Sequence, residues 1–218
     1  MNELVRTLEP RYYLDPDLFR QEQKGLMARS WQFAGHVSQL RSPGDYFTFE
    51  VAGENLFCVR DRDSEIHAFF NVCKHRAHEL VSGHGCAKRL VCPYHNWTYD
   101  LNGRLMGGPN LASVPNLDIS KIRLTSVRIE NFHGFLFVNL DDTAAPMDEW
   151  FPQVRSEILE FVPQIAELEL LQWITVSERC NWKLSVENYS ECYHCRINHK
   201  TFANGVIKPE TYDIRPQG

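Results

Sequence analysis

The sequence lacks any uninterrupted apolar run near the roughly 20 residues needed to cross a bilayer. The N-terminus, Met-Asn-Glu-Leu-Val-Arg, also lacks the apolar core of a secretory signal. Lys and Arg are scattered and the formal charge is −5, so the charge pattern does not favour nucleic-acid binding. We therefore expect a cytoplasmic globular protein without a membrane or nucleic-acid partner, and 43% hydrophobic content is ample for its core.

The cysteines do not indicate a disulfide framework. The seven cysteines are an odd number in a chain without an export signal, so thiolate ligation is the better use for some of them. Cys58, Cys86 and Cys180 belong to no motif. We expect these three to be buried or half-buried apolar side chains.

The residue pattern changes along the chain from helical spacing to short strand-like runs. Residues 16–31 have mixed helical spacing, with Asp15 as a predicted N-cap. Residues 36–140 consist of short β-branched and aromatic runs broken by turn signals, which indicates an all-β domain. Within it, Asn102-Gly103 predicts a hairpin and residues 134–140 a buried closing strand.

A boundary is predicted at residues 141–146, which separates the all-β domain from a third segment, 141–218. Residues 150–165 show apolar side chains at three- and four-residue steps, which predicts one amphipathic helix. Residues 170–176 indicate a strand, and Asn181 is a predicted cap for a helix that starts at Trp182. With residues 1–35 as a helical segment, the expected fold class is α+β.

Two Cys/His pairs carry the first chemical signal. Cys73-Lys-His75 and Cys92-Pro-Tyr-His95 each follow a strand-like run, so each pair is expected in a loop at a strand end. Two thiolates and two imidazoles are the ligand set of a Rieske [2Fe–2S] centre. A structural zinc site uses the same residue types, but common zinc modules group them differently, so we favour the iron–sulfur cluster.

A second signal is Glu191 with His194 and His199. If the helix from Trp182 reaches Cys195, Glu191 and His194 share one face, whereas His199 lies about 140° from His194 by helical geometry. Both imidazoles can meet one metal only if the helix ends or bulges near Asn198. A zinc site formed by Cys192, Cys195 and these two histidines would crowd adjacent residues onto one ion, so we do not favour it.

From about Trp31 to His199 the chain resembles the large (alpha) subunits of Rieske non-heme iron oxygenases, and Glu191-Cys192-Tyr193-His194-Cys195 looks like the branch that acts on carnitine, betaine and related quaternary amines. The resemblance implies that Cys73, His75, Cys92 and His95 hold a [2Fe–2S] cluster. It implies that His194 and His199 hold a mononuclear Fe(II), with Glu191 as the electron-transfer bridge to a neighbouring subunit. It also implies a helix-grip catalytic domain, begun within 141–218.

The expected function is the oxygenase component of a multicomponent Rieske system, a mono- or dioxygenase. A flavin and iron–sulfur reductase or a ferredoxin would bring electrons from NAD(P)H, and O₂ would be used to hydroxylate, demethylate or cleave a small organic substrate, aromatic or quaternary amine. The family places a third, carboxylate iron ligand far downstream, and none is found here, so we expect a truncated chain whose full-length form is a homotrimer. The alternative is a Rieske electron-transfer protein without oxygenase activity.

Overall fold

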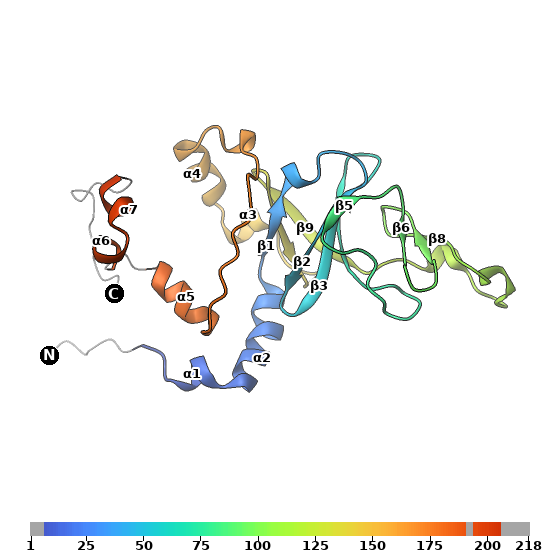
Figure 1. The fold of residues 1–218 in the computed structure, drawn as a ribbon, viewed down its shortest axis with the longest axis horizontal. Coiled ribbons are helices and arrows are strands. Elements are labelled where there is room, and N and C mark those ends of the chain that lie inside the picture. Colours follow the sequence, from blue (N-terminus) through green and yellow to red (C-terminus); the bar gives the residue numbers. More distant parts are fainter. Residues whose placement is uncertain (1–6, 191–193, 206–218) are drawn as a thin grey trace. The chain divides into compact units, whose positions relative to one another are not determined.

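The structure, a computed structural model, describes residues 7–190 and 194–205 (Figure 1). The chain divides into two compact units, Arg20–Trp173 and Met1–Phe19 together with Ile174–Gly218. No helix within the described ranges combines the length and the apolar character that a membrane span requires. Helices and antiparallel strands are both present, which confirms the α+β class.

The larger unit is built on an antiparallel sheet of seven strands in the order β1-β10-β9-β4-β3-β2-β5. The strands are β1 Gln32–His36, β2 Asp45–Val51, β3 Glu54–Arg60, β4 Ile66–Phe70, β5 His84–Cys86, β9 Ser126–Phe132 and β10 Phe135–Asn139. β10 confirms the closing strand predicted over residues 134–140. Short 3₁₀ helices join some of these elements: η1 Met27–Arg29, η2 Val37–Gln39, η3 Leu111–Ser113 and η4 Ile119–Lys121.

A separate three-stranded sheet consists of β6 Leu90–Val91, β7 Thr98–Tyr99 and β8 Leu105–Gly107. The turn between β7 and β8 confirms the predicted Asn102-Gly103 hairpin. Gly103 has a φ of +81°, and a Cβ there would lie 2.7 Å from the Phe69 ring, so this position needs glycine. The pairing of β6 with β7 places the residues before and after the second Cys/His pair side by side.

β3 is the common wall of two apolar cores. Leu56 and Cys58 face one core, whereas Phe57 and Val59 face the other, and all four side chains are fully buried. The alternation follows from the two-residue period of a strand, and burial of both faces explains the unbroken apolar run. The core with Phe57 also contains the inner residues of the small sheet, Leu90, Tyr99 and Leu105, together with Cys73 and Cys92.

The helix predicted over residues 150–165 is wrong. The structure has α3 Met147–Trp150, α4 Val154–Phe161 and the 3₁₀ turn η5 Ile165–Glu167 instead. Pro152 and Pro163 fall at the two breaks, because proline lacks the backbone N–H and clashes with the preceding helical turn. No strand forms over residues 170–176, since among the described residues no strand pairs with it. Leu170 instead donates its N–H to Ser38 Oγ at 2.9 Å.

The smaller unit contains α1 Arg11–Leu14, the first residues of α2 Pro16–Gly25, α5 Trp182–Tyr189, α6 Cys195–Asn198 and α7 Lys200–Gly205. Asp15 caps α2 as predicted, since its Oδ1 accepts from Asp17 N at 2.8 Å. Asn181 caps α5 in the same way through Lys183 N at 3.1 Å. α2 ends at Gly25, six residues before the predicted limit at Trp31.

Candidate metal centres

The first Cys/His pair lies in a loop directly after β4. Cys73 N donates to His78 O at 2.9 Å, and Ala77 N donates to Cys73 O at 3.0 Å, so the loop closes on its own backbone. Ala77 has a φ of +55°, a left-handed conformation that is unfavourable for a residue with a Cβ. His75 lies within this closed turn.

The second loop, between β6 and β7, repeats the same backbone pattern. Cys92 N donates to Trp97 O at 2.8 Å, and Asn96 N donates to Cys92 O at 2.9 Å. Asn96 has a φ of +56° at the position that corresponds to Ala77. The two loops are therefore local copies of one another, although the histidine follows the cysteine by two residues in the first loop and by three in the second.

The four side chains of the two loops come together. Cys73 and Cys92 are both 2% exposed and belong to one core cluster. Burial raises the pKa of the Cys73 thiol, and the nearby Cys92 thiol adds to the rise. The rings of His75 and His95 lie 4.6 Å apart between centroids, with an angle of 73° between their planes. The fold thus pairs cysteine with cysteine inside and histidine with histidine toward the surface.

His95 provides a direct test of whether these residues fit a metal cluster. Its Nδ1 atom is buried and has no hydrogen-bond partner in the described structure. Burial, followed by the neighbouring His75, lowers the pKa of His95, which favours the neutral ring that a metal ligand requires. A buried nitrogen without a partner is costly unless something fills that place, and an iron atom would do so.

The two cysteines and two histidines are the ligand set of a two-iron cluster. Within the described residues, no group of three or more His, Cys, Asp or Glu side chains is placed to hold a single metal ion. A tetrahedral zinc site would need four such ligands around one point. A Rieske cluster needs only two ligands for each of its irons, two thiolates on one and two imidazoles on the other.

Two aromatic side chains contact the ligand residues. The Trp97 indole stacks on His75, with ring centroids 4.8 Å apart and planes 9° from parallel. The buried hydroxyl of Tyr99 lies 3.3 Å from Cys73 Sγ and accepts the N–H of Lys74 at 3.1 Å. A thiolate sulfur can only accept, so the hydroxyl would donate its hydrogen to Cys73 Sγ when this cysteine is a ligand, a contact that the motif spacing does not reveal.

Asn71 holds the first loop at its base. Its Oδ1 accepts from Leu80 N at 3.0 Å and from Val81 N at 3.2 Å, while its Nδ2 donates to Val81 O at 2.7 Å. The side chain is 2% exposed, so these bonds are shielded from water. Asn71 thus ties the start of the loop to the chain that follows it, although sequence reasoning did not identify it.

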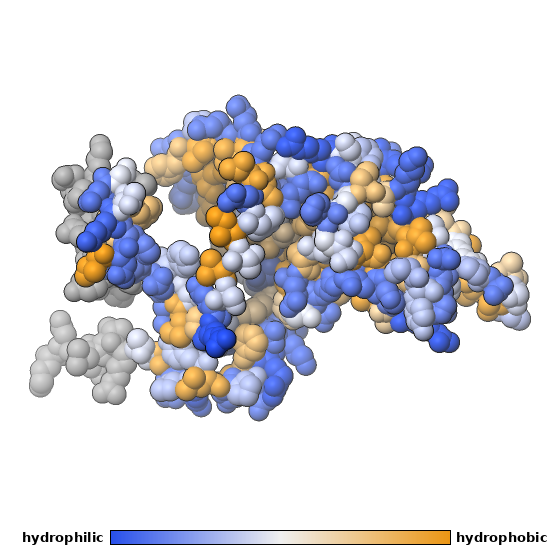
Figure 2. All heavy atoms as spheres, in the orientation of Figure 1, coloured by the Kyte–Doolittle hydropathy of each residue, from blue (hydrophilic) through white to orange (hydrophobic). Residues whose placement is uncertain are grey.

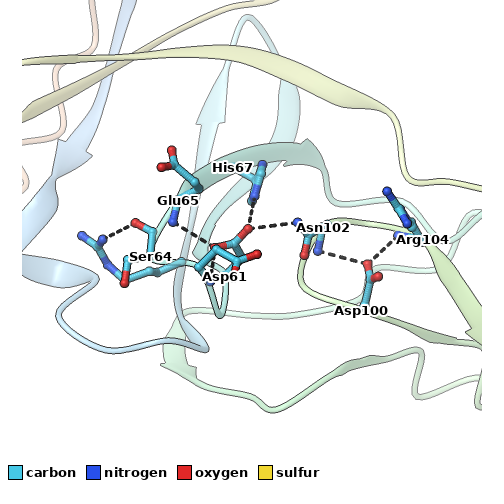
Figure 3. Close-up of polar contacts among 9 residues, drawn as sticks. Asp61, Ser64, Glu65, His67, Asp100, Asn102 and Arg104 are labelled. Atoms are coloured by element: carbon cyan, nitrogen blue, oxygen red, sulfur yellow. Dashed lines mark hydrogen bonds and ion pairs between the residues drawn. The ribbon is translucent and has the colours of Figure 1, made fainter.

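A second buried polar group, Asp61, fixes the β7–β8 hairpin (Figure 3). One carboxylate oxygen accepts from Asp63 N and Glu65 N, both at 2.9 Å. The other contacts His67 Nε2 at 2.7 Å and accepts from Asn102 Nδ2 at 2.9 Å. Burial opposes the charge, but the hydrogen bonds from His67 and the backbone outweigh it and hold the pKa of Asp61 below its ordinary value.

The second predicted histidine pair lies in the smaller unit. The rings of His194 and His199 are 5.2 Å apart between centroids and 74° from parallel. Two imidazoles that share one ion at metal–nitrogen distances of about 2.1 Å have centroids about 5 Å apart, so the pair fits a shared metal. His199 interrupts the helices, with φ −118° and ψ 54° between α6, which ends at Asn198, and α7.

The single helix considered from Trp182 to Cys195 is wrong. α5 ends at Tyr189, and His194 precedes the separate helix α6. Lys183 is the buried residue of α5, and its ammonium lies 5.1 Å from the Trp182 ring centroid and 5.9 Å from that of Tyr13. Glu191 and Cys192 lie outside the described residues, so the predicted bridge, the shared face with His194 and the zinc alternative have no described geometry.

The remaining histidines and cysteines stand outside the paired Cys/His loops, and His36 Nε2 is, like His95 Nδ1, buried without a hydrogen-bond partner among the described residues. His36 contacts Ser38 Oγ at 2.9 Å, His133 contacts Arg155 O at 3.1 Å and His78 contacts Glu79 O at 2.6 Å. Cys58, Cys86 and Cys180 are free thiols. Cys58 is buried as predicted, but Cys86 and Cys180 are exposed, a correction that follows from their places at a sheet edge and before α5.

Comparisons with protein families match both regions. Residues 30–118 match the Rieske [2Fe-2S] domain, and residues 165–213 match the ring hydroxylating alpha subunit (catalytic domain). Together these families imply a Rieske cluster and a mononuclear iron. The first match contains both Cys/His loops, and the second contains His194 and His199.

Individual relatives agree. The carnitine monooxygenase oxygenase subunit of Escherichia coli (strain K12) is 40% identical over 92% of this chain and 54% of its own length. The glycine betaine monooxygenase oxygenase subunit of Chromohalobacter salexigens is 32% identical over 95% of this chain and 46% of its own length. The chain thus spans about half the length of the curated relatives it matches.

A solved structure of a quaternary ammonium Rieske monooxygenase with L-carnitine is similar with a TM-score of 0.85 and 36% identity, over 90% of this chain and 56% of that one. Naphthalene 1,2-dioxygenase with indole follows with a TM-score of 0.79 and 33% identity, over 88% and 44% of the two chains. The paired loops, the histidine pair and both family matches lead to one conclusion: this chain carries a Rieske [2Fe-2S] domain and part of the catalytic domain of a ring hydroxylating alpha subunit.

Proposed function

We propose that this chain serves in the oxygenase component of a multicomponent Rieske system. Cys73 and Cys92 are the thiolate ligands of a [2Fe–2S] cluster, and His75 and His95 are its imidazole ligands. The observation that carries this assignment is the pair of matching loops, which places two buried sulfurs together and leaves His95 Nδ1 without a partner. The proposal also assigns residues 36–140 to the cluster-binding domain and residues 141–218 to the beginning of the catalytic domain.

His194 and His199 are the proposed ligands of the mononuclear iron. Their rings lie at a separation that suits one shared ion. When bound, the cluster supplies one-electron transfer and the mononuclear iron supplies O₂ activation. The protein's part is to hold each imidazole in place, through the break at His199 in one site and through Trp97 in the other.

The proposed reaction is oxygenation of a small organic substrate, with a quaternary ammonium compound as the favoured class. Support for this class comes from similarity to oxygenase subunits that are named for carnitine and glycine betaine. Electrons would come from NAD(P)H through a flavin and iron–sulfur reductase or a ferredoxin. We also predict that Glu191 forms a bridge between subunits of a homotrimer. The cytoplasmic location stays a prediction.

Metal analysis tests the assignment. We expect the anaerobically reconstituted full chain to hold about three irons and two labile sulfides, two irons in the cluster and one at the second site. His194→Ala should lower the iron content by about one, with the cluster's visible and EPR spectra unchanged. His84→Ala, which alters an exposed histidine on β5, is the matched control and should keep all the iron.

The alternative function, electron transfer alone, predicts about two irons in both the wild type and His194→Ala. It also predicts that neither protein consumes O₂ in the presence of a reductant and a quaternary ammonium substrate. A colourless protein that retains zinc would contradict both iron-based functions.

A further inference from the structure

The outer face of the small sheet is exposed beside the proposed cluster. Leu90, Tyr99 and Leu105 point into the core, so the alternation of strands turns Val91 and Met106 outward. These two apolar side chains are 46% and 51% exposed. Figure 2 shows apolar and hydrophilic residues adjoining one another over the end of the molecule that carries β6 and β8.

Cations collect next to this apolar face. A cavity of about 300 Å³ is lined by Arg62, Lys88 and Arg89 together with Asp63, Asp100 and Met106. Arg104 lies on the β7–β8 hairpin, which also carries Asp100 and Met106. Arg123 pairs with Arg104 in an isolated antiparallel bridge. Both are exposed, as are the three cations of the cavity. We call Arg62, Lys88, Arg89, Arg104 and Arg123, together with Val91 and Met106, the basic face.

The cations of the basic face lack ion-pair partners in the described part of the chain. No ion pair among the described residues involves any of its five cations. Of the two nearby acids, Asp100 is engaged through Oδ1, which accepts the backbone N–H groups of Asn102 and Arg104. A concentration of unpaired positive charge is notable in a chain whose formal charge is −5. Such a face attracts a partner of negative charge.

The basic face is joined to the proposed cluster by short, rigid connections. Arg89 precedes Cys92 by only three residues, with β6 between them. On the neighbouring strand, Tyr99 reaches Cys73 Sγ with its hydroxyl. The hairpin that carries Arg104 is fixed by the bond from Asn102 to Asp61 (Figure 3). A protein docked here would lie beside the ligand loops.

We infer that the basic face is the docking surface for an acidic one-electron carrier with an iron–sulfur centre, and this inference rests on the proposed function. In the docked complex the carrier's reduced cluster loses one electron and the cluster of this chain gains it. Exposed Val91 and Met106 favour a protein over a small anion, because protein interfaces combine an apolar centre, often with Met and Arg, with a polar rim.

Charge reversal tests the inference in the full chain with its cluster in place. The probe is a reduced, acidic plant-type [2Fe–2S] ferredoxin, mixed with the oxidised chain in a stopped-flow spectrometer over a series of salt concentrations. We expect Arg89→Glu and Lys88→Glu each to lower the second-order rate of cluster reduction at low salt by about tenfold, because steering by charge accelerates association by at least this factor. Both should also flatten the salt dependence.

Lys24→Glu on α2 is the matched control, since it changes the net charge by the same amount away from the basic face. It should keep the wild-type rate. Reduction by dithionite at high salt should be equal in all variants, which shows that the cluster is intact. Equal ferredoxin rates in Arg89→Glu and wild type, or an equal loss in Lys24→Glu, would overturn the docking surface. A chain that dithionite cannot reduce would overturn the proposed function itself.

Discussion

Removal of the Tyr99 hydroxyl should lower the reduction potential of the cluster. The hydroxyl lies 3.3 Å from Cys73 Sγ inside a fully buried core, and a ligand thiolate at that position can only accept its hydrogen. A hydrogen bond to a ligand sulfur stabilises the reduced state more, because reduction increases the negative charge that the bond meets. Tyr99→Phe keeps the ring in place and removes only this interaction.

The size of the effect follows from the strength of the bond. A hydrogen bond to a charged group contributes about 2 kcal/mol. If about half of that depends on the added electron, the loss is about 1 kcal/mol, which corresponds to about 45 mV for a one-electron couple. The expected result is therefore a fall of this order in the midpoint potential, measured by redox titration of the visible or circular dichroism spectrum.

Tyr94→Phe supplies the control, because the exposed Tyr94 ring lies 3.8 Å from that of His95 but its hydroxyl makes no described contact with a ligand sulfur. Its potential should stay within about 10 mV of the wild type, well inside the shift expected for a lost charged hydrogen bond. An unchanged or higher potential in Tyr99→Phe, with full iron content, would refute the role assigned to this hydroxyl.

Four further changes test the scaffold around the loops. Ala77→Gly should relieve the left-handed strain, stabilise the protein by about 1 kcal/mol and raise Tm by about 2–4 °C in calorimetry, whereas Asn96→Ala should lower it. Asn71→Ala should cost about 2 kcal/mol, because two buried N–H groups lose their acceptor, and should speed the loss of iron to a chelator. Asp61→Asn should lower the free energy of unfolding by about 2 kcal/mol at pH 7, measured with urea, and should reduce the loss of stability that the wild type shows at acidic pH. The pKa of Asp61 is held below its ordinary value, so the stabilisation is present above pH about 4 and is lost as the pH falls through the lowered value; an unchanged pH profile would contradict this.

Local chemistry made part of the structure predictable. The Asn102-Gly103 turn and the caps at Asp15 and Asn181 depend on residues only a few positions apart, so the sequence indicates them directly. The Cys/His spacing likewise predicts two loops at strand ends, and the structure places the four residues together. Their role as ligands remains to be tested by metal analysis.

Other features depend on partners that are distant in the sequence. The bond from Asn102 to Asp61 joins residues 41 positions apart, and the contact between Tyr99 and Cys73 joins residues 26 apart. No periodicity reports such contacts. The helix predicted over residues 150–165 is divided for a different reason: the apolar spacing continues along the segment, but Pro152 and Pro163 interrupt the backbone hydrogen bonds.

The double role of Cys73 and Cys92 has a consequence for the stability of the protein. Both side chains are members of the core that packs against Phe57 and Val59, so this core is complete only when its sulfurs have their final partners. The free energy of metal binding would therefore contribute to the free energy of folding in this region. The core on the other side of β3 contains no proposed ligand. Loss of the cluster should therefore destabilise the core around Phe57 more than the core around Leu56.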